Sequence, residues 1–127
     1  MTHRTLLKGR NVLLVEDEMM VAMLLQCLLE DEGCNVICAG FLERATLLAQ
    51  ERAIDVAVVD VNLHGEHSYP VVDALAARGI PFVFSTGYGG VDIRTLYPDR
   101  PVLAKPYNPH DLIAALSALI AAASGND

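Results

Sequence analysis

The chain has 127 residues and a formal net charge of -7, and 53% of its residues are hydrophobic. This length predicts a single domain over residues 1–127, with a core over about residues 11–122. The acidic balance argues against a dedicated nucleic-acid surface, which would show as a basic patch. No apolar stretch approaches the roughly 20 residues that span a membrane, and the Leu6-Leu7 pair is too short for a secretory signal. We therefore expect a cytoplasmic protein with no nucleic-acid and no membrane partner.

The first half of the chain alternates apolar runs with amphipathic stretches, which predicts strands followed by helices. The first predicted helix ends near Gly33. The predicted strands cover Asn11–Val15 and residues 35–38 and 55–59, and the predicted helices cover residues 19–30 and 42–52.

The second half continues the alternation with one weak segment. A helix is predicted over residues 69–78, and it stops at Gly79 before a β-branched and aromatic strand over residues 81–85. Residues 89–100 begin with two glycines and hold few apolar residues, so their helix is expected to be short or mobile. A fifth strand over residues 101–104 and an Ala/Leu-rich helix from 108 or 109 to about 122 complete the pattern.

Strands that alternate with helices predict a parallel sheet with helices on both faces, because parallel strands need crossover connections. The near-continuous apolar runs VLLV, VAVV and PFVF agree, since such strands are buried on both faces. We therefore expect an α/β protein, a five-stranded (βα)5 three-layer sandwich.

The three cysteines and the basic N-terminus predict no special chemistry. Cys27, Cys34 and Cys38 are odd in number and show no C-x-x-C spacing, so we interpret them as small apolar residues, not as a disulfide framework or a zinc site. The cluster of Arg4, Lys8 and Arg10 is interpreted as a solvated N-terminal arm, too small to bind nucleic acid.

Reactive side chains follow the predicted strands at their carboxyl ends. Glu16 and Asp17 follow the first strand and Asp60 the third, Thr86 follows Ser85 at the end of the fourth, and Lys105 follows the fifth. The carboxyl ends of parallel strands share one edge of the sheet, where ligands bind. We therefore expect these residues to converge on one pocket.

The predicted pocket has the composition of a phosphoryl-transfer site. Three converging carboxylates repel one another unless a cation is present, and oxygen ligands without His or Cys favour Mg²⁺ over zinc. Lys105 supplies an ammonium group and Thr86 a hydroxyl, both suited to phosphoryl oxygens. Catalysis in such a site consists chiefly of positioning and charge neutralisation.

Four motifs resemble the receiver domains of two-component response regulators: VLLVEDE, VAVVDVNLHG, FSTG and AKP. The resemblance covers nearly all of residues 11–122 and implies a flavodoxin-like fold with strand order 2-1-3-4-5. It implies that Asp60 is the phosphoacceptor and that Glu16, Asp17, Asp60 and the backbone carbonyl of Asn62 hold Mg²⁺. It further implies that Thr86 and Lys105 contact the phosphoryl group, and that a histidine kinase or phosphotransfer protein is the donor. The peptide bond between Lys105 and Pro106 is implied to be cis.

The chain departs from the common receiver pattern at one position. Receivers usually carry Tyr or Phe three residues before the lysine, and here that residue is Val102. PFVFSTGYGG resembles a subgroup of mostly single-domain receivers named for a Phe-Ala-Thr-Gly motif, with Ser85 in place of the Ala, and members of that subgroup also lack this aromatic. Tyr88 is a possible replacement for the moving ring. His64 and His67 are interpreted as solvated loop residues that tune access to the site.

Three other functions are less favoured by the motifs. A phosphohydrolase of the haloacid-dehalogenase type, the main alternative, places D-x-D-x-T after its first strand, where this chain has Glu16-Asp17-Glu18. A flavodoxin-like nucleotide or FMN module would carry a Gly/Ser/Thr-rich phosphate loop there, and a receiver reduced to docking would have lost its acidic residues or Lys105. The chain ends after the last predicted helix, so we expect a stand-alone regulator. It would act as an adaptor or as a phosphate sink, through protein contact.

Overall fold

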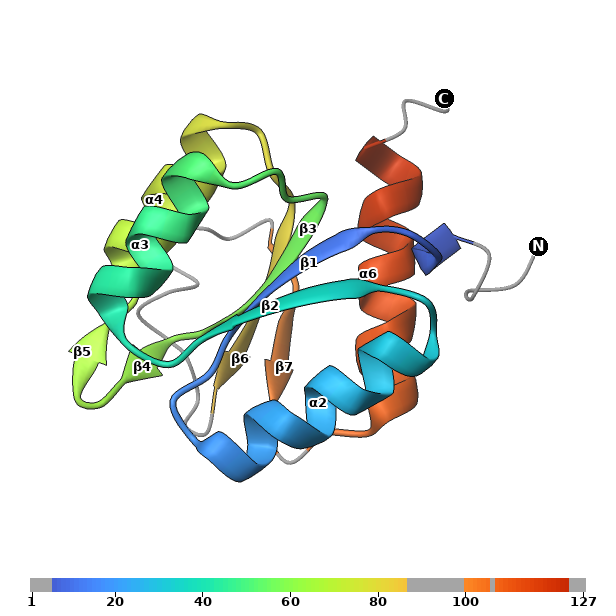
Figure 1. Cartoon of the computed structure of the whole chain (residues 1–127), viewed down its shortest axis with the longest axis horizontal. Helices are drawn as coiled ribbons and strands as arrows, with labels where there is room; N and C mark the ends of the chain where they lie inside the picture. Colours follow the sequence, from blue (N-terminus) through green and yellow to red (C-terminus); the bar gives the residue numbers. More distant parts are fainter. Residues whose placement is uncertain (1–5, 87–99, 106, 124–127) are drawn as a thin grey trace.

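The computed structural model describes residues 6–86, 100–105 and 107–123. A sheet lies between two layers of helices (Figure 1), and its strands are all parallel in the order β2-β1-β3-β6-β7. These strands are β1 Asn11–Val15, β2 Asn35–Ala39, β3 Val56–Asp60, β6 Phe82–Thr86 and β7 Val102–Ala104. Counted within this sheet the order is 2-1-3-4-5, which confirms the predicted flavodoxin-like fold.

Helices cover both faces of the sheet, with α3 and α4 on one face and α2 and α6 on the other (Figure 1). Their bounds are α2 Met19–Asp31, α3 Leu42–Glu51, α4 Tyr69–Ala77 and α6 Pro109–Ala123. The predicted helix and strand ends agree with these bounds to within about one residue. The weak helix predicted over residues 89–100 lies almost wholly outside the described residues. None of the helices in the described part has the length and hydropathy that a bilayer span requires.

The sheet is buried most deeply at its centre, which explains the apolar runs in the sequence. Every residue of β3 and β6 is buried, whereas the edge strands β2 and β7 are partly exposed. Phe82 and Phe84 fill the core under α3 and α4, and Leu14, Leu112 and Leu116 fill the core under α2 and α6. Each such side chain contributes roughly 1.5–3 kcal/mol on burial, so the two cores hold the strand ends in fixed positions.

Two glycines end helices by the same hydrogen-bonding pattern. Gly33 follows α2 and Gly79 follows α4, both with φ in the left-handed region, at 92° and 71°. In each case the next residue donates back five positions, Cys34 to the Leu29 carbonyl at 3.1 Å and Ile80 to Leu75 at 2.9 Å. This Schellman arrangement satisfies carbonyls at the helix end and favours glycine. This arrangement explains why the two predicted helices end at Gly33 and Gly79.

The N-terminal segment is packed, so the prediction of a solvated arm was wrong for residues 6–10. Leu7 is completely buried in the core under α2 and α6. Gly9 N–H donates to the Gly33 carbonyl at 2.8 Å, and the Arg10 side chain donates to the Leu6 carbonyl at 3.1 Å. Burial of one leucine is enough to anchor a short segment. Lys8 remains exposed, and Arg4 lies outside the described residues.

The cysteines are three free thiols in different surroundings. Burial raises the pKa of Cys34 to about 11 and also raises that of Cys38. The Cys34 sulfur lies 3.6 Å from the Leu7 carbonyl and the Cys38 sulfur 3.2 Å from Oε1 of Gln26. A raised thiol pKa disfavours the thiolate that redox and metal chemistry requires.

Candidate functional site

The side chains of Asp60, Glu16 and Lys105 meet at the carboxyl edge of the sheet. Asp60 is the last residue of β3, and side chains alternate along a strand, so Asp60 faces the same side as Val58 in the core under α2 and α6. Glu16 follows β1 and Lys105 follows β7. The convergence expected from strand ends alone is therefore realised in the structure.

Lys105 bridges two carboxylates. Its Nζ lies 2.8 Å from Glu16 Oε1 and 2.9 Å from Asp60 Oδ2, and 3.9 Å from Glu18 Oε1. The Glu16 side chain is 1% exposed and that of Asp60 is 8% exposed, against 20% for Lys105. Two nearly buried carboxylates thus share one ammonium group, and the local charge stays negative.

This burial shifts the ionisation of all three groups. Loss of solvation raises the pKa of Glu16 and of Asp60, although hydrogen bonds from Lys105 oppose the shift. Burial alone would lower the pKa of Lys105, but the hydrogen bonds to Glu16 and Asp60 outweigh it and raise that pKa. The raised carboxyl pKa values reflect burial. The excess negative charge follows from three carboxylates, those of Glu16, Asp17 and Asp60, that gather around one ammonium group, and a further cation would relieve it.

Asp17 is held by a hairpin that the sequence reasoning missed. Residues 62–67 form β4 (Asn62–Leu63) and β5 (Glu66–His67), joined by His64 and Gly65 at φ of 50° and 85°. Positive φ at both turn residues is typical of a tight type I′ hairpin. The His64 N–H donates to Asp17 Oδ2 at 2.9 Å. The hairpin therefore lies against the acidic site; the only sequence signal for it is the glycine after His64.

The histidines of this hairpin are exposed, as predicted, but each stacks on another ring. His64 stacks on Phe41 with ring centroids 4.5 Å apart, and His67 stacks on Tyr69 at 5.2 Å. The Phe41 contact joins the hairpin tip to the segment before α3. The stacking fixes the tip beside the site, while whether these histidines tune access stays a prediction.

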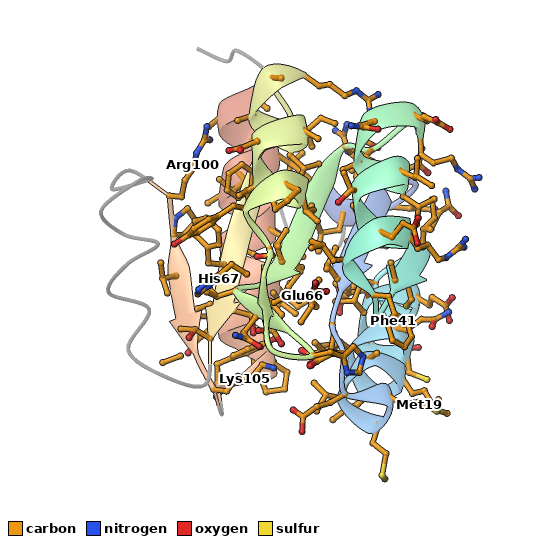
Figure 2. The ribbon with its side chains drawn as sticks, turned by 90° about the vertical axis from the view of Figure 1, so that its left-hand side faces the viewer. Met19, Phe41, Glu66, His67, Arg100 and Lys105 are labelled. Atoms are coloured by element: carbon orange, nitrogen blue, oxygen red, sulfur yellow. The ribbon has the colours of Figure 1, made fainter. Side chains whose placement is uncertain are left out.

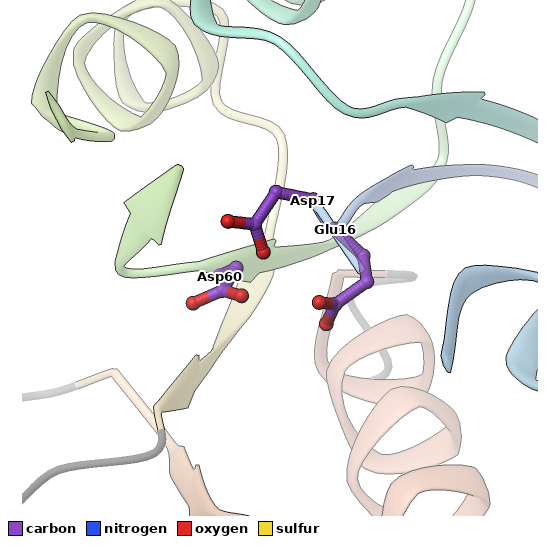
Figure 3. A group of neighbouring side chains, drawn as sticks. All are labelled: Glu16, Asp17 and Asp60. Carbon is purple, nitrogen blue, oxygen red and sulfur yellow. The ribbon is translucent and has the colours of Figure 1, made fainter. Parts of the chain in front are cut away.

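Glu16, Asp17 and Asp60 have the geometry of a candidate cation site. One carboxylate oxygen of each lies within 4.8 Å of the others, and Figure 3 shows the three side chains converging. Mg²⁺ takes oxygen ligands in octahedral geometry. The donor set fits Mg²⁺, because it is all oxygen and carries excess negative charge even with Lys105 in place.

The other predicted site residues are placed less completely. Asn62 lies two residues after Asp60, and its N–H donates to Asp60 Oδ1 at 3.2 Å. This bond does not involve the Asn62 carbonyl, whose role as a Mg²⁺ ligand stays a prediction. Thr86 is 4% exposed, and its carbonyl accepts the Lys105 N–H at 2.7 Å. Val102 begins β7 at the position that lacks an aromatic ring. Tyr88 and the bond between Lys105 and Pro106 lie outside the described residues.

Two further hydroxyls lie near the acceptor: that of Ser85, which was predicted at the end of the fourth strand but given no role, and that of Tyr107, which the sequence reasoning missed. Ser85 pairs with Asp60 in the register of β3 and β6, and Tyr107 follows Lys105 by two residues. Both side-chain oxygens are buried, and Tyr107 packs against the core under α2 and α6. Strand alternation from Val83 would have placed Ser85 on that side. No sequence signal indicates how closely the two hydroxyls approach the site.

A family model for the response regulator receiver domain matches residues 12–117. The chain belongs to the response regulator receiver domain family. It is 31% identical over 111 residues to the uncharacterized transcriptional regulatory protein YbdJ of Bacillus subtilis, covering 84% of this chain and 49% of YbdJ. Receiver domains are signalling domains of two-component systems. This chain spans about half the length of the curated relatives it matches.

Solved structures support the same assignment. SdrG from Sphingomonas melonis Fr1 is 38% identical, with a TM-score of 0.77 over 94% of this chain and 99% of SdrG. The receiver domain of the sensor histidine kinase PA1611 from Pseudomonas aeruginosa PAO1 has the same fold at 24% identity, with a TM-score of 0.77 over 88% of this chain and 98% of that domain. That structure has a magnesium ion coordinated in its active-site cleft.

Proposed function

We propose that the chain accepts a phosphoryl group on Asp60 from a histidine kinase or phosphotransfer protein, in a reaction that depends on Mg²⁺. The observation that carries the proposal is the Asp60 carboxylate, held at a strand end between the Lys105 ammonium and two further carboxylates. A carboxylate oxygen of Asp60 attacks phosphorus as the bond to the donor imidazole breaks, and the imidazole takes up a proton. The products are an aspartyl phosphate and a neutral donor histidine.

The role of the surroundings in this reaction is electrostatic. The arriving phosphoryl group adds negative charge to a site that already has an excess. We propose that Glu16, Asp17, Asp60 and the Asn62 carbonyl would hold Mg²⁺, which supplies charge neutralisation when bound. Magnesium in the cleft of the PA1611 receiver domain supports this choice of metal. Lys105 and Thr86 would bind phosphoryl oxygens by charge-assisted hydrogen bonds.

Incubation with acetyl phosphate and Mg²⁺ tests the proposal directly. Intact-protein mass spectrometry should show one added phosphoryl group, stable to acid and labile to base. A chelator should prevent the addition, because the metal neutralises the charge that builds up. An unmodified mass at saturating donor and Mg²⁺ would rule out the acceptor role.

Asp17→Ala should weaken Mg²⁺ binding by at least about tenfold, because it removes one of three ligand side chains. The fold should survive, since Asp17 is only partly buried and its removal relieves repulsion within the acidic cluster. Titration of the metal followed by calorimetry measures the change. Asp31→Ala, at the exposed end of α2, is the matched control and should bind Mg²⁺ like the wild type. Equal affinities for the two variants would place the metal elsewhere.

The apolar outer face of α2 is the surface we assign to the phosphoryl donor. Met19, Met20, Met23 and Leu24 are 75%, 83%, 59% and 69% exposed. Apolar side chains concentrated in this way favour protein contact. The helix begins three residues after Glu16, and Met19 lies near the same end of the molecule as Lys105 (Figure 2). A donor bound here would present its histidine to Asp60.

Met20→Glu combined with Met23→Glu should slow phosphoryl transfer from a phosphorylated histidine kinase by about tenfold or more, because it puts charge into an apolar contact. Labelling by acetyl phosphate should stay unchanged, since that donor needs no protein surface. The assay measures phosphoryl transfer from a histidine kinase that phosphorylates the wild-type chain. Leu47→Glu, exposed on α3 across the sheet, is the control. Transfer unaffected by the double substitution would remove α2 from the donor surface.

We further propose that the phosphorylated chain signals by protein contact or drains phosphoryl groups from a shared kinase, as a stand-alone regulator. The resemblance of PFVFSTGYGG to a subgroup of mostly single-domain receivers supports the proposal of a stand-alone regulator. Capture of partners by the beryllofluoride-bound protein separates the two outputs, because a phosphate sink needs no partner beyond its kinase.

A further inference from the structure

The β4–β5 hairpin is attached to the acidic cluster at its base and at its tip. At the base, the Asn62 N–H donates to Asp60 Oδ1 at 3.2 Å, and the Asn62 side-chain oxygen accepts the Gly65 N–H at 2.9 Å. At the tip, the His64 N–H donates to Asp17 Oδ2 at 2.9 Å. The hairpin therefore bridges the proposed phosphoacceptor and a second carboxylate of the candidate metal site.

His64 donates this hydrogen bond from a backbone conformation in which glycine is the more stable residue. Its φ is 50°, in the left-handed region, where a side chain with a Cβ meets steric resistance that glycine avoids. Such conformations persist where the surrounding structure holds them, and they cluster at functional sites. Two contacts hold His64: its N–H on Asp17 and its ring on Phe41.

Phe41 provides a fixed surface for the His64 ring. The two rings stack with centroids 4.5 Å apart and planes inclined by 18°, although Phe41 is 65% exposed and does not belong to the core. The main chain before Phe41 passes close to the acidic site. A Cβ on Gly40 would lie 3.3 Å from the Glu16 carbonyl oxygen and 3.8 Å from the Asp17 Cα. The ring stack thus joins the hairpin tip to a segment that already lies against the main chain of Glu16 and Asp17.

We propose that Phe41 and His64 form a clasp that positions Asp17 as a metal ligand. The ring stack holds the His64 N–H on Asp17 Oδ2, and this bond fixes the direction in which the carboxylate points. Groups that hydrogen-bond to a metal ligand orient it, and their loss lowers metal affinity. Phe41 and His64 are positioning residues, because they act through Asp17. The inference rests on the proposed Mg²⁺-dependent phosphorylation of Asp60 and adds what sets the affinity of the site for the metal.

Titration of variants with Mg²⁺ tests the clasp. Phe41→Ala and His64→Gly each remove the stack, and each should weaken Mg²⁺ binding by about twofold to tenfold, the range expected for one aromatic pair. Glycine suits the turn and keeps the N–H, so a merely structural role of His64 predicts no loss from His64→Gly. Phe41→Tyr keeps the ring and should bind like the wild type. Leu47→Ala, at an exposed apolar position of α3, is the matched control.

Two further measurements show whether the effect passes through Asp17. In a chain that already carries Asp17→Ala, addition of Phe41→Ala should weaken Mg²⁺ binding no further, because the carboxylate that the clasp orients is gone. In the metal-free protein, hydrogen exchange of the His64 N–H should be slow in the wild type and in Phe41→Tyr. The exchange should be faster in Phe41→Ala and in Asp17→Ala.

Three results would overturn the inference while the wild type binds Mg²⁺. They are equal affinities of the wild type, Phe41→Ala and His64→Gly, an equal loss from Phe41→Ala with and without Asp17, and exchange of the His64 N–H that does not respond to Phe41→Ala. Absence of Mg²⁺ binding by the wild type is a different failure. It would overturn the proposed dependence of phosphorylation on Mg²⁺, and the inference with it.

Discussion

Asp60→Asn should abolish labelling by acetyl phosphate, the largest effect on activity that we expect from any single substitution. The amide has no anionic oxygen to attack phosphorus, and its shape preserves the fold. The hydrogen bond from the Asn62 N–H at 3.2 Å can be kept by the amide oxygen. Intact mass after incubation with the donor and Mg²⁺ should show no phosphoryl group on the variant.

The control for this experiment is another aspartate with no part in the acidic cluster. Asp111 lies exposed in the first turn of α6, and Asp111→Asn should label like the wild type. Residual labelling of Asp60→Asn would direct attention to Asp17, whose carboxylate lies in the same cluster. Full labelling of Asp60→Asn would refute Asp60 as the acceptor.

The fold and the cluster could be predicted because both depend on simple regularities. Buried parallel strands must be apolar, so β3 and β6 are visible as runs of hydrophobic residues. Their carboxyl ends share an edge, which brings Asp60 and Lys105 together although 45 positions separate them. Gly33 and Gly79 mark helix ends because few other residues adopt their conformation.

The features that the sequence reasoning missed depend on contacts that leave no periodic pattern in the sequence. The β4–β5 hairpin is only two residues long on each side, too short for alternation to show. Leu7 belongs to an apolar pair with Leu6 that is too short to show a period, and its burial depends on packing in the core under α2 and α6. The position of Tyr107 beside Ser85 depends on the paths of β6 and β7 together.

The site is arranged so that charge is balanced differently in each state. At rest Lys105 is the cation nearest to Glu16 and Asp60 within the described residues, and it contacts both. A metal held by Glu16, Asp17 and Asp60 would make that ammonium available for phosphoryl oxygens. The lysine therefore has two proposed roles, one in stability and one in phosphoryl binding, and the next substitution separates them.

Lys105→Met should lower the free energy of unfolding of the metal-free protein by about 3–5 kcal/mol at neutral pH, because it leaves two buried carboxylates without their cation. Methionine keeps the apolar length of the side chain, so the loss reports charge. Mg²⁺ should restore much of this stability, whereas phosphorylation should stay slow. Urea unfolding with and without Mg²⁺ measures the effect, and Lys8→Met, at an exposed position, is the control.

The pH dependence of the same variant identifies the cause. The ordinary pKa values of Glu16 and Asp60 are 4.5 and 3.8, and burial raises both in the folded protein. Removal of Lys105 should raise them further. A carboxyl group whose pKa is higher when folded favours folding below its ordinary pKa, and this contribution is lost as pH rises through the raised value. The deficit of Lys105→Met should therefore be small near pH 4 and grow toward neutrality. A deficit independent of pH would mean that the lysine stabilises the fold by packing and not by charge.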